Sequence, residues 1–379
     1  MNFAKKIPLL KFFSSIKITV MCLSLLFILT LWGTIDQVEN GLYHAQEQFF
    51  NSFFFTVFGL FPFPGAQLVL WVLFMNLICV ALTRFVYRLS HLGILMIHFG
   101  LLTYFVAAFV TLHGVDESQL TLMEGESSNV SSSYHDWELS VWKQNGEKKH
   151  VVAYDTKFLK PGEILDFPEY GFQAITKIYY PNAEAFSRRE DLHSVYLNIS
   201  GLESLEILEP HKEPEKNFPG AEFFLKIRNQ KVVPILLFGR EEMATPLKIG
   251  KETFYFMLRR KRHALPLTLK LMDFTKEVHP NTDVARSYKS KVEIQSNGLN
   301  REVTIFMNNP LRYKNYTFYQ ASYSVDAKGR ESSTFAVVKN TGRLLPYIAS
   351  LTTFGGLVTH FLLLAFMSRN RVSLKEKYV

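Results

Sequence analysis

The chain has 379 residues, 48% of them hydrophobic, with 34 phenylalanines and a formal net charge of +8. Its hydrophobic residues gather into long runs, which is typical of a membrane protein and excludes a single soluble domain. The positive charge does not indicate nucleic-acid binding, because many basic residues flank the hydrophobic runs: Lys5, Lys6, Lys11, Lys17, Arg84, Arg88, Arg369, Arg371, Lys375 and Lys377.

Four hydrophobic runs approach the roughly 20 residues that a membrane-spanning helix needs. They are Ile16–Trp32, Leu68–Leu82, Leu92–Leu112 and Leu344–Met367. We do not expect the first run to be a cleaved secretory signal, since bulky residues end it and no small-residue cleavage site follows. The sequence therefore predicts a membrane domain over residues 1–112 with three spans, and a C-terminal span with its tail over residues 344–379.

The basic flanks predict the orientation of these spans. With four spans, all of the flanks fall on the same face, which the positive-inside rule makes cytoplasmic. The connection Gly33–Gln67 lies on the opposite face and carries acidic residues but no lysine or arginine. We expect a multi-pass protein of the bacterial inner (cytoplasmic) membrane with both termini in the cytoplasm, and a thylakoid membrane is the alternative.

An aromatic segment, Phe49–Phe63, precedes the second span. Aromatic side chains gather at the level of the lipid headgroups. We therefore predict an interfacial helix here that ends at Pro62 and Pro64.

The long region between the third and fourth spans, residues 113–343, shows the two-residue alternation of β-strands. Examples are Trp137–Trp142, Val292–Gln295 and Val303–Phe306, with turn signals at Asn145-Gly146 and Asn297-Gly298. We predict a large extracytoplasmic domain of one or two antiparallel sandwich or barrel-like lobes. The predicted fold class is thus an α + β membrane protein with four transmembrane helices.

Several kinds of chemistry are excluded by missing motifs. The two cysteines, Cys22 and Cys79, lie in predicted spans, so we expect no disulfide in the exported domain. The sequence has no Cys-x-x-Cys, no Cys-x-x-Cys-His, no Gly-x-x-x-x-Gly-Lys and no His-Glu-x-x-His. The chain is therefore not itself a c-type cytochrome, an ATPase or a zinc protease.

One basic run, Arg259–His263, is not explained by membrane topology. We interpret it as a solvated β-turn or strand end. The alternative is a surface that holds haem propionates, acidic lipid headgroups or an acidic partner.

His98 lies in the middle of the third span, where an imidazole is costly unless it is used. One interpretation is a hydrogen bond to a neighbouring helix. The other is axial ligation of haem iron, which suits a neutral imidazole. Gly93 and Gly100 leave room nearby for either a partner helix or a flat ring.

Four other histidines, His44, His91, His113 and His360, lie in or near the predicted spans. The fourth span places His360 at a depth similar to that of His98, which suggests an in-chain His98–His360 pair as a hypothesis. His91 is expected at the interface beside Arg88, and His44 and His113 are expected at the surface.

Five segments of the chain carry a resemblance to a known family: Gly33–Gln37, Leu92–Gly100, Leu265–Phe274, Tyr288–Ser290 and Asn309–Gln320. Through these segments the chain resembles the ResB family, also called CcsB, over essentially its whole length. The last segment is similar to that family's signature, in which Asn315 stands where the family has glycine, and asparagine tolerates a left-handed turn. Taken alone, the signature indicates a turn and an aromatic strand with a structural role.

The resemblance implies system II cytochrome c maturation. In that system, ResB and a ResC/CcsA-type membrane protein carry haem b across the membrane and attach it to apocytochrome c, whose thiols a thioredoxin-like protein keeps reduced. The resemblance also implies that His98 is one axial ligand of haem iron and that the partner supplies the other, which competes with the proposal for His360. The chain would then be a non-catalytic subunit of a haem-transporting cytochrome c synthase complex.

Two further functions stay open. A b-type electron-transfer subunit would hold haem permanently and would favour the His98–His360 pair. A membrane-anchored β-domain that serves as an assembly platform would bind no haem, and His98 would then be a packing residue.

Overall fold

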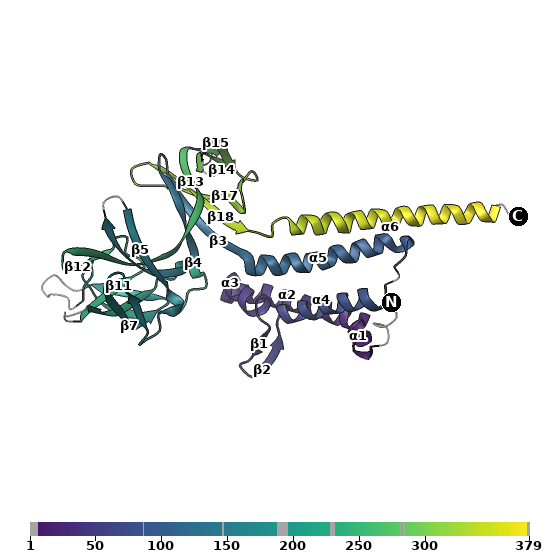
Figure 1. Ribbon diagram of the computed structural model, residues 1–379, viewed down its shortest axis with the longest axis horizontal. Coiled ribbons are helices and arrows are strands. Elements are labelled where there is room, and N and C mark those ends of the chain that lie inside the picture. Colours follow the sequence, from purple (N-terminus) through teal and green to yellow (C-terminus); the bar gives the residue numbers. More distant parts are fainter. Residues whose placement is uncertain are drawn as a thin grey trace. The chain divides into compact units, whose positions relative to one another are not determined.

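A computed structural model shows long helices before and after a β-rich region of the chain (Figure 1). The structure describes residues 7–85, 87–145, 148–187, 196–227, 232–280, 282, 285–296 and 298–376. Of the residues named above, Lys5, Lys6, Gly146, Asn297 and Lys377 lie outside this set, as do the side chains of Arg369, Arg371 and Lys375.

Two compact units make up the fold. A membrane unit comprises Met1–Asp116 and Lys339–Val379, and a β unit comprises Glu117–Val338. The boundaries predicted from the sequence, at residues 112/113 and 343/344, lie within five residues of these.

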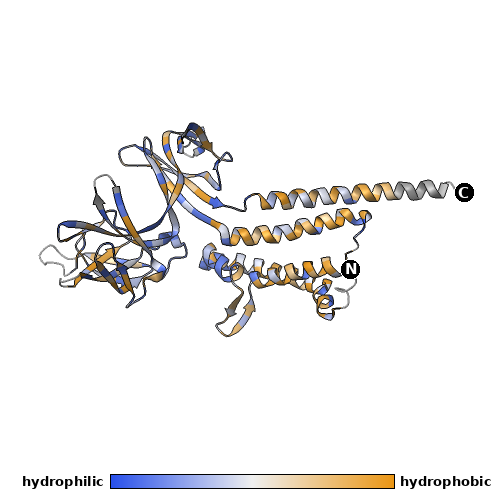
Figure 2. Ribbon diagram, in the orientation of Figure 1, coloured by the Kyte–Doolittle hydropathy of each residue, from blue (hydrophilic) through white to orange (hydrophobic). Residues whose placement is uncertain are grey.

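Within the described residues of the membrane unit, four helices are long and hydrophobic enough to cross a bilayer. They are α2 (Ile16–Asn40), α4 (Ala66–Thr83), α5 (Leu92–Gly114) and α6 (Leu345–Glu376). Figure 2 shows that hydrophobic residues predominate along these helices, and many of their large apolar side chains are exposed, as expected for helices whose solvent is lipid. The predicted four-span α + β membrane fold is confirmed.

A short helix, α1 (Pro8–Phe13), precedes α2 and is tied to α4 by a buried amide. Asn76 of α4 is 2% exposed and accepts a hydrogen bond of 2.8 Å from the Thr19 hydroxyl. Its amide nitrogen donates to the carbonyl oxygens of Phe13 and Ser15. The amide gives the Phe13 carbonyl oxygen a donor and adds a second donor to the Ser15 carbonyl oxygen, which also accepts from the Ile18 nitrogen.

Helices α5 and α6 run antiparallel and meet at glycines. A Cβ atom added to Gly93 would lie 2.6 Å from the Gly356 carbonyl oxygen and from the His360 Cα, and one added to Gly356 would lie 2.8 Å from the Ile97 nitrogen. Further along the contact, Gly100 packs against Thr353. Small residues thus allow the two backbones to touch, as is common between membrane helices.

The aromatic segment after α2 does not form the predicted interfacial helix. The chain passes through α3 (Leu42–Ala45) and the π-helix η2 (Gln46–Phe50) into a hairpin of β1 (Phe54–Val57) and β2 (Phe61–Pro64). Val57 and Phe61 pair across a three-residue loop in which Phe58 and Gly59 have φ of 53° and 69° and the Leu60 nitrogen donates to the Val57 carbonyl oxygen, a turn whose twist suits a hairpin. Aromatic residues favour strands, and Pro62 is tolerated at an edge, so the β-hairpin forms instead of the helix.

Antiparallel sheets build the β unit, as predicted. One sheet has ten strands with the main order β15-β14-β13-β4-β3-β18-β17-β16, with β5 beside β4 and β12 beside β13. A second sheet has the order β11-β10-β7-β6, and β8 pairs with β9. The strand bounds are β3 Val115–Met123, β4 Ser127–Asn145, β5 Lys148–Asp155, β6 Ile164–Phe167, β7 Phe172–Tyr180, β8 Ala183–Ser187, β9 Leu202–Ile207, β10 Gly220–Ile227, β11 Val233–Phe238, β12 Thr245–Ile249, β13 Glu252–Val278, β14 Ala285–Ser296, β15 Leu299–Phe306, β16 Leu311–Tyr313, β17 Tyr316–Val325 and β18 Glu331–Asn340.

Two hydrophobic cores share the long strand β13. Its first half contributes Phe254, Phe256 and Leu258 to one core, which also contains side chains of β7 and β10. Its second half contributes Leu265, Leu267, Leu269 and Leu271 to another core, together with β14 and β18. The inward residues change from even to odd numbers between these halves, so the strand passes from one lobe to the other at the intervening basic run.

That basic run, Arg259–His263, was predicted to be a solvated turn or strand end, and this prediction is wrong. It lies inside β13, paired with β4. Arg259 is 12% exposed and forms an ion pair of 2.9 Å with Glu138, which lies directly opposite it on β4. Lys261 pairs with Asp155 at 2.9 Å. Cross-strand carboxylates therefore hold these cations within the fold.

Candidate functional site

His98 lies half-buried on α5 in the membrane unit, and its ring orientation is fixed by its own helix. Its Nδ1 is 2.8 Å from the carbonyl oxygen of Ile94. A carbonyl oxygen only accepts hydrogen bonds, so Nδ1 carries the proton and the neutral ring keeps its lone pair on Nε2. The Phe85 ring meets the imidazole edge-on, with 4.5 Å between centroids. The arrangement leaves Nε2 available as a ligand for a metal.

The structure does not bring His98 and His360 together. His360 lies on the face of α6 that packs against Gly93 of α5. Gly93 comes five residues before His98, so the two positions are about 7.5 Å apart along the α5 axis. At 3.6 residues per turn, His98 projects about 140° around α5 from Gly93, away from the α6 contact. Ligation of one iron by both histidines would require a different packing of α5 and α6, and the in-chain pair stays a prediction.

A groove of about 470 Å³ lies on the membrane unit between α4 and α5. The groove lies at one end of the helices of the membrane unit, where α5 finishes and where α4 and α6 start. We call this the outer end. The groove, called the outer groove below, is lined by apolar and aromatic side chains with two polar residues, Gln67 and His113. Its lining is Phe53, Gln67, Leu70, Trp71, Phe74, Phe105, Val106, Ala108, Phe109, Leu112 and His113.

His113 was predicted to lie at the surface, and the structure leaves it exposed and also places it in this lining. Its ring packs against Phe109 edge to face, with centroids 4.6 Å apart. The spacing in the sequence carried a signal: fifteen residues on an α-helix rotate by about 60°, so His98 and His113 share one face of α5. The shared face of His98 and His113 was not among the predictions from the sequence.

The remaining histidines of the membrane unit lie apart from both positions. His91 is in the 3₁₀ turn η3 (Leu89–His91), with its Nδ1 3.0 Å from the Ser90 hydroxyl. His44 is exposed on α3.

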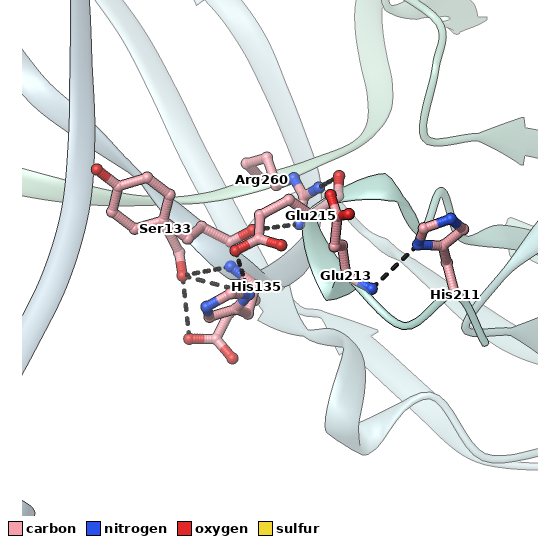
Figure 3. A network of polar contacts seen from close by, with 8 residues as sticks. Ser133, His135, His211, Glu213, Glu215 and Arg260 are labelled. Atoms are coloured by element: carbon pink, nitrogen blue, oxygen red, sulfur yellow. Dashed lines mark hydrogen bonds and ion pairs between the residues drawn. The ribbon is translucent and has the colours of Figure 1, made fainter. Parts of the chain in front are cut away.

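A polar network in the β unit surrounds a bulge in β4 (Figure 3). Four residues, Ser133–Asp136, lie opposite the single residue Lys261, and the Ser133 hydroxyl accepts a hydrogen bond of 3.1 Å from the Asp136 nitrogen. Arg260 donates to the carbonyl oxygens of Tyr134 and Glu215 and lies over the Trp137 ring. Such bulges often re-aim side chains.

Burial shapes the titration of this network. It lowers the pKa of the Arg260 guanidinium and raises the pKa of the Tyr134 hydroxyl. His135 lies 3.8 Å from Glu215, and His211 accepts a hydrogen bond from the Glu213 nitrogen (Figure 3). Among the described residues, no three histidine, cysteine or acidic side chains are arranged to hold a metal ion. The contacts indicate a structural clamp between β4 and the 3₁₀ turn η5 (Pro214–Lys216).

Comparison with known proteins shows what the chain is similar to. Residues 251–346, which run from just before the start of β13 into the first turn of α6, match the model of the ResB-like family. Over these residues the chain is similar to the ResB-like family. It is also 24% identical over 299 residues to Protein NrfI of Wolinella succinogenes, an alignment that covers 78% of this chain and 30% of that protein. The chain thus spans less than a third of the length of this curated relative.

The matched region of this ResB-like chain contains the signature Asn309–Gln320, whose side chains serve the core of the second lobe. Leu311 and Phe318 are 3% and 0% exposed. Gln320 accepts a hydrogen bond of 2.7 Å from Ser290 and donates one of 2.7 Å to Ser333. The glutamine therefore ties together β14, β17 and β18, in agreement with a structural role for the signature.

The turn inside the signature differs from the expectation for Asn315. The left-handed residue is Lys314, with φ of 51°, and Asn315 is not in that region. The positive φ falls at the first of the two turn residues between Tyr313 and Tyr316, which is the pattern of a type II′ hairpin turn.

Proposed function

We propose that this ResB-like chain is the haem-binding subunit of a system II cytochrome c maturation complex. With a ResC/CcsA-type membrane partner it binds haem b within a bacterial inner membrane and passes it to the outer side. There the haem is attached to the Cys-x-x-Cys-His motif of apocytochrome c. The observation that carries the proposal is the free Nε2 of His98 on a membrane-spanning helix of a ResB-like protein.

The surroundings of His98 suit an axial ligand of haem iron. The Ile94 carbonyl selects the tautomer that leaves Nε2 unprotonated, and a hydrogen bond from the other ring nitrogen is the usual support of a metal-binding histidine. Phe85 limits rotation of the ring. Haem is the cargo here, and His98 would hold it by one axial bond.

The second axial ligand is proposed to come from the partner. His360 faces α5 at Gly93 and projects from a different side of the helix pair than His98. A ligand from another chain can approach the face of α5 that carries His98 without disturbing the close contact between α5 and α6. This arrangement would place haem at the boundary between the two proteins, so haem binding would depend on the partner.

Covalent attachment itself is not assigned to this chain. Each thioether forms when a cysteine thiol adds across a haem vinyl group, with the sulfur bonding to one vinyl carbon and the proton passing to the other. The thiols belong to apocytochrome c and must be reduced, which a thioredoxin-like protein would ensure. The two cysteines of this chain are buried in α2 and α4 and are not available for exchange.

The proposed orientation follows from charge. The lysines and arginines that flank the helices would face the cytoplasm, and the β unit would lie on the opposite side, where apocytochrome c is matured. Reporter fusions after residue 376 and within the β unit would test this, and an exported C-terminus would contradict it.

Visible spectra of the protein purified with and without its partner test the haem proposal. We expect a bis-histidine haem band in the complex that is absent from the isolated chain and lost in His98→Ala. His91→Ala serves as the control. His91 is close to His98 in the sequence, but it lies in the turn before α5, and its Nδ1 contacts the Ser90 hydroxyl instead of a helix carbonyl. His98→Ala should also stop cytochrome c maturation, while the abundance of the protein stays near normal.

Other results would favour the remaining functions. A haem band that persists in the isolated chain and is lost in either His98→Ala or His360→Ala would indicate a b-type electron-transfer subunit. No haem in any preparation would indicate an assembly platform. Normal holocytochrome levels in His98→Ala would refute the ligand assignment.

A further inference from the structure

We propose that the outer groove is a second haem-binding position, with His113 as the axial ligand of the iron. This proposal deepens the proposed function and rests on it, because it supposes that haem leaves His98 toward the outer side. It assigns to this chain, and not only to its partner, a place where haem is received after crossing the membrane.

The outer groove has the shape and composition of a site for a flat apolar ring. Its walls come from one face of α4 and one face of α5, which meet through the aromatic pairs Trp71–Phe109 and Phe74–Phe105 with centroids 5.7 and 5.5 Å apart. Its volume of about 470 Å³ lies within the usual range for small-molecule and cofactor sites. A macrocycle would contact ring faces and edges here without displacing a charged group, since none lines the groove.

His113 supplies the polar atom that such a site needs. In the described part of the chain, neither of its ring nitrogens has a hydrogen-bond partner, whereas Nδ1 of His91 and Nδ1 of His98 each have one. Its contact with Phe109 holds the imidazole at the rim of the groove. The residue is exposed, so a ligand can reach it without opening the helix pair.

A guanidinium nitrogen of Arg343 that has no partner among the described residues lies at the same level of the membrane unit. Arg343 follows Gly342, which packs against the Val110 side chain, and Val110 comes three residues before His113 on α5. Its Nη1 is buried and has no hydrogen-bond partner among the described residues. A buried guanidinium nitrogen without a partner is costly, and haem propionates are carboxylates of the kind that would pair with it.

The two histidines define a path along a single helix face. His98 and His113 are about 22 Å apart along α5 and about 60° apart around it. A haem released from His98 toward the outer end therefore stays on the α5 face that continues into the outer groove. Two separate positions on one face allow stepwise transfer, in which the second ligand binds the iron after the first has let it go.

Haemin titration of the full chain in lipid nanodiscs, without the partner, tests the proposal. The His98→Ala variant removes the inner position and leaves the outer one to be measured alone. In this background, His113→Ala should weaken haemin binding roughly tenfold or more, and His44→Ala, which removes an exposed histidine of the same unit, should not change it. Added imidazole should restore the spectrum of a His113→Gly variant, which a merely structural role would not allow.

Two more variants separate the contributions of shape and charge. Ala108→Phe fills the outer groove while leaving every histidine in place, and should abolish binding in the same background. Arg343→Gln should weaken binding of haemin but not of haemin dimethyl ester, whose propionates carry no charge.

The contrary results are distinct from failure of the proposed function. Equal effects of His113→Ala and His44→Ala, or unchanged binding in Ala108→Phe, would show only partition of haemin into lipid and would overturn the outer position. Binding of a neutral quinone without binding of haemin would also overturn it. Full haem content of His98→Ala with the partner present would refute the inner ligand instead, and the titrations in the His98→Ala background would be unaffected.

Discussion

The backbone of Gly93 lies directly against the backbone of His360, so that a Cβ atom on residue 93 would be 2.6 Å from the His360 Cα. The contact fixes how α5 and α6 are rotated relative to each other, because a side chain at Gly93 or at Gly356 would force the two helices apart. It therefore also decides that His98 faces away from α6.

Replacing this glycine should loosen the helix pair. Gly93→Ala inserts a methyl group against backbone atoms that cannot move aside, and we expect a loss of about 1–3 kcal/mol in the free energy of unfolding despite alanine's better helix propensity. Gly355→Ala is the matched control, because its Cβ would meet only the Met96 methyl at 3.6 Å. Unfolding in detergent measures both variants, and equal stability would show that the close contact is unimportant.

The buried amide of Asn76 should hold α1 in place. Asn76→Leu removes the side-chain donor of the Phe13 carbonyl oxygen, at a cost of about 1–3 kcal/mol, while the Ser15 carbonyl oxygen keeps its bond from the Ile18 nitrogen. We expect faster proteolysis of the junction between α1 and α2. Asn40→Leu, which removes an exposed amide that bonds to Asp36, should leave the cleavage rate unchanged. Identical cleavage of the two variants would contradict the role of Asn76.

The ion pair between Glu138 and Arg259 should be among the most sensitive contacts of the β unit. Both side chains are largely buried, 8% and 12% exposed, so Glu138→Gln leaves a buried guanidinium without its charge partner. Removing one partner of such a pair costs about 3–5 kcal/mol. The exposed pair Lys291–Glu302 is the control, and Glu302→Gln should cost less than about 1 kcal/mol. Thermal unfolding of Glu138→Gln and Glu302→Gln measures the two costs. Similar unfolding midpoints for the two variants would show that the buried ion pair is no more important than the exposed one.

The membrane helices were predictable because a single property, a run of apolar residues of the right length, determines them. The β-strands were predictable from alternation. The hairpin after α2 was not, since Phe58 and Gly59 form the turn through their backbone angles and the apolar run around them suits a helix equally well. Local pattern could not separate the two.

The position of charged groups depends on contacts between distant strands. Arg259 and Glu138 are 121 residues apart in the sequence and become neighbours only through the pairing of β13 with β4. A run of five basic residues therefore reads as solvated from the sequence, although opposite strands neutralise part of it. The depth of His360 was estimated from helix ends, whereas the Gly93 contact shows which face and level it occupies.

The acid stability of the β unit should depend on Asp155. Burial raises the pKa of this carboxyl, but hydrogen bonds from the Lys157 nitrogen and from Lys261 more than offset it, so the pKa lies below its usual range. A lowered pKa in the folded state adds stability at pH values above the unfolded value of about 3.9, and this stability is lost as the pH falls through the folded pKa. The effect on Lys261 has the opposite sign: its pKa is raised by Asp155, so its contribution is lost only at strongly alkaline pH.

Asp155→Asn should therefore lower the thermal midpoint near pH 7 and make it less sensitive to acid below about pH 4, because the carboxyl that takes up a proton on unfolding is gone. The loss at neutral pH should be about 1–2 kcal/mol, as for hydrogen bonds to a charged group. Asp166→Asn, at an exposed position on β6, should leave both the midpoint and its pH dependence unchanged. Parallel curves for Asp155→Asn and the unmodified protein between pH 7 and pH 3 would show that the contacts with Lys157 and Lys261 do not set the acid limit of stability.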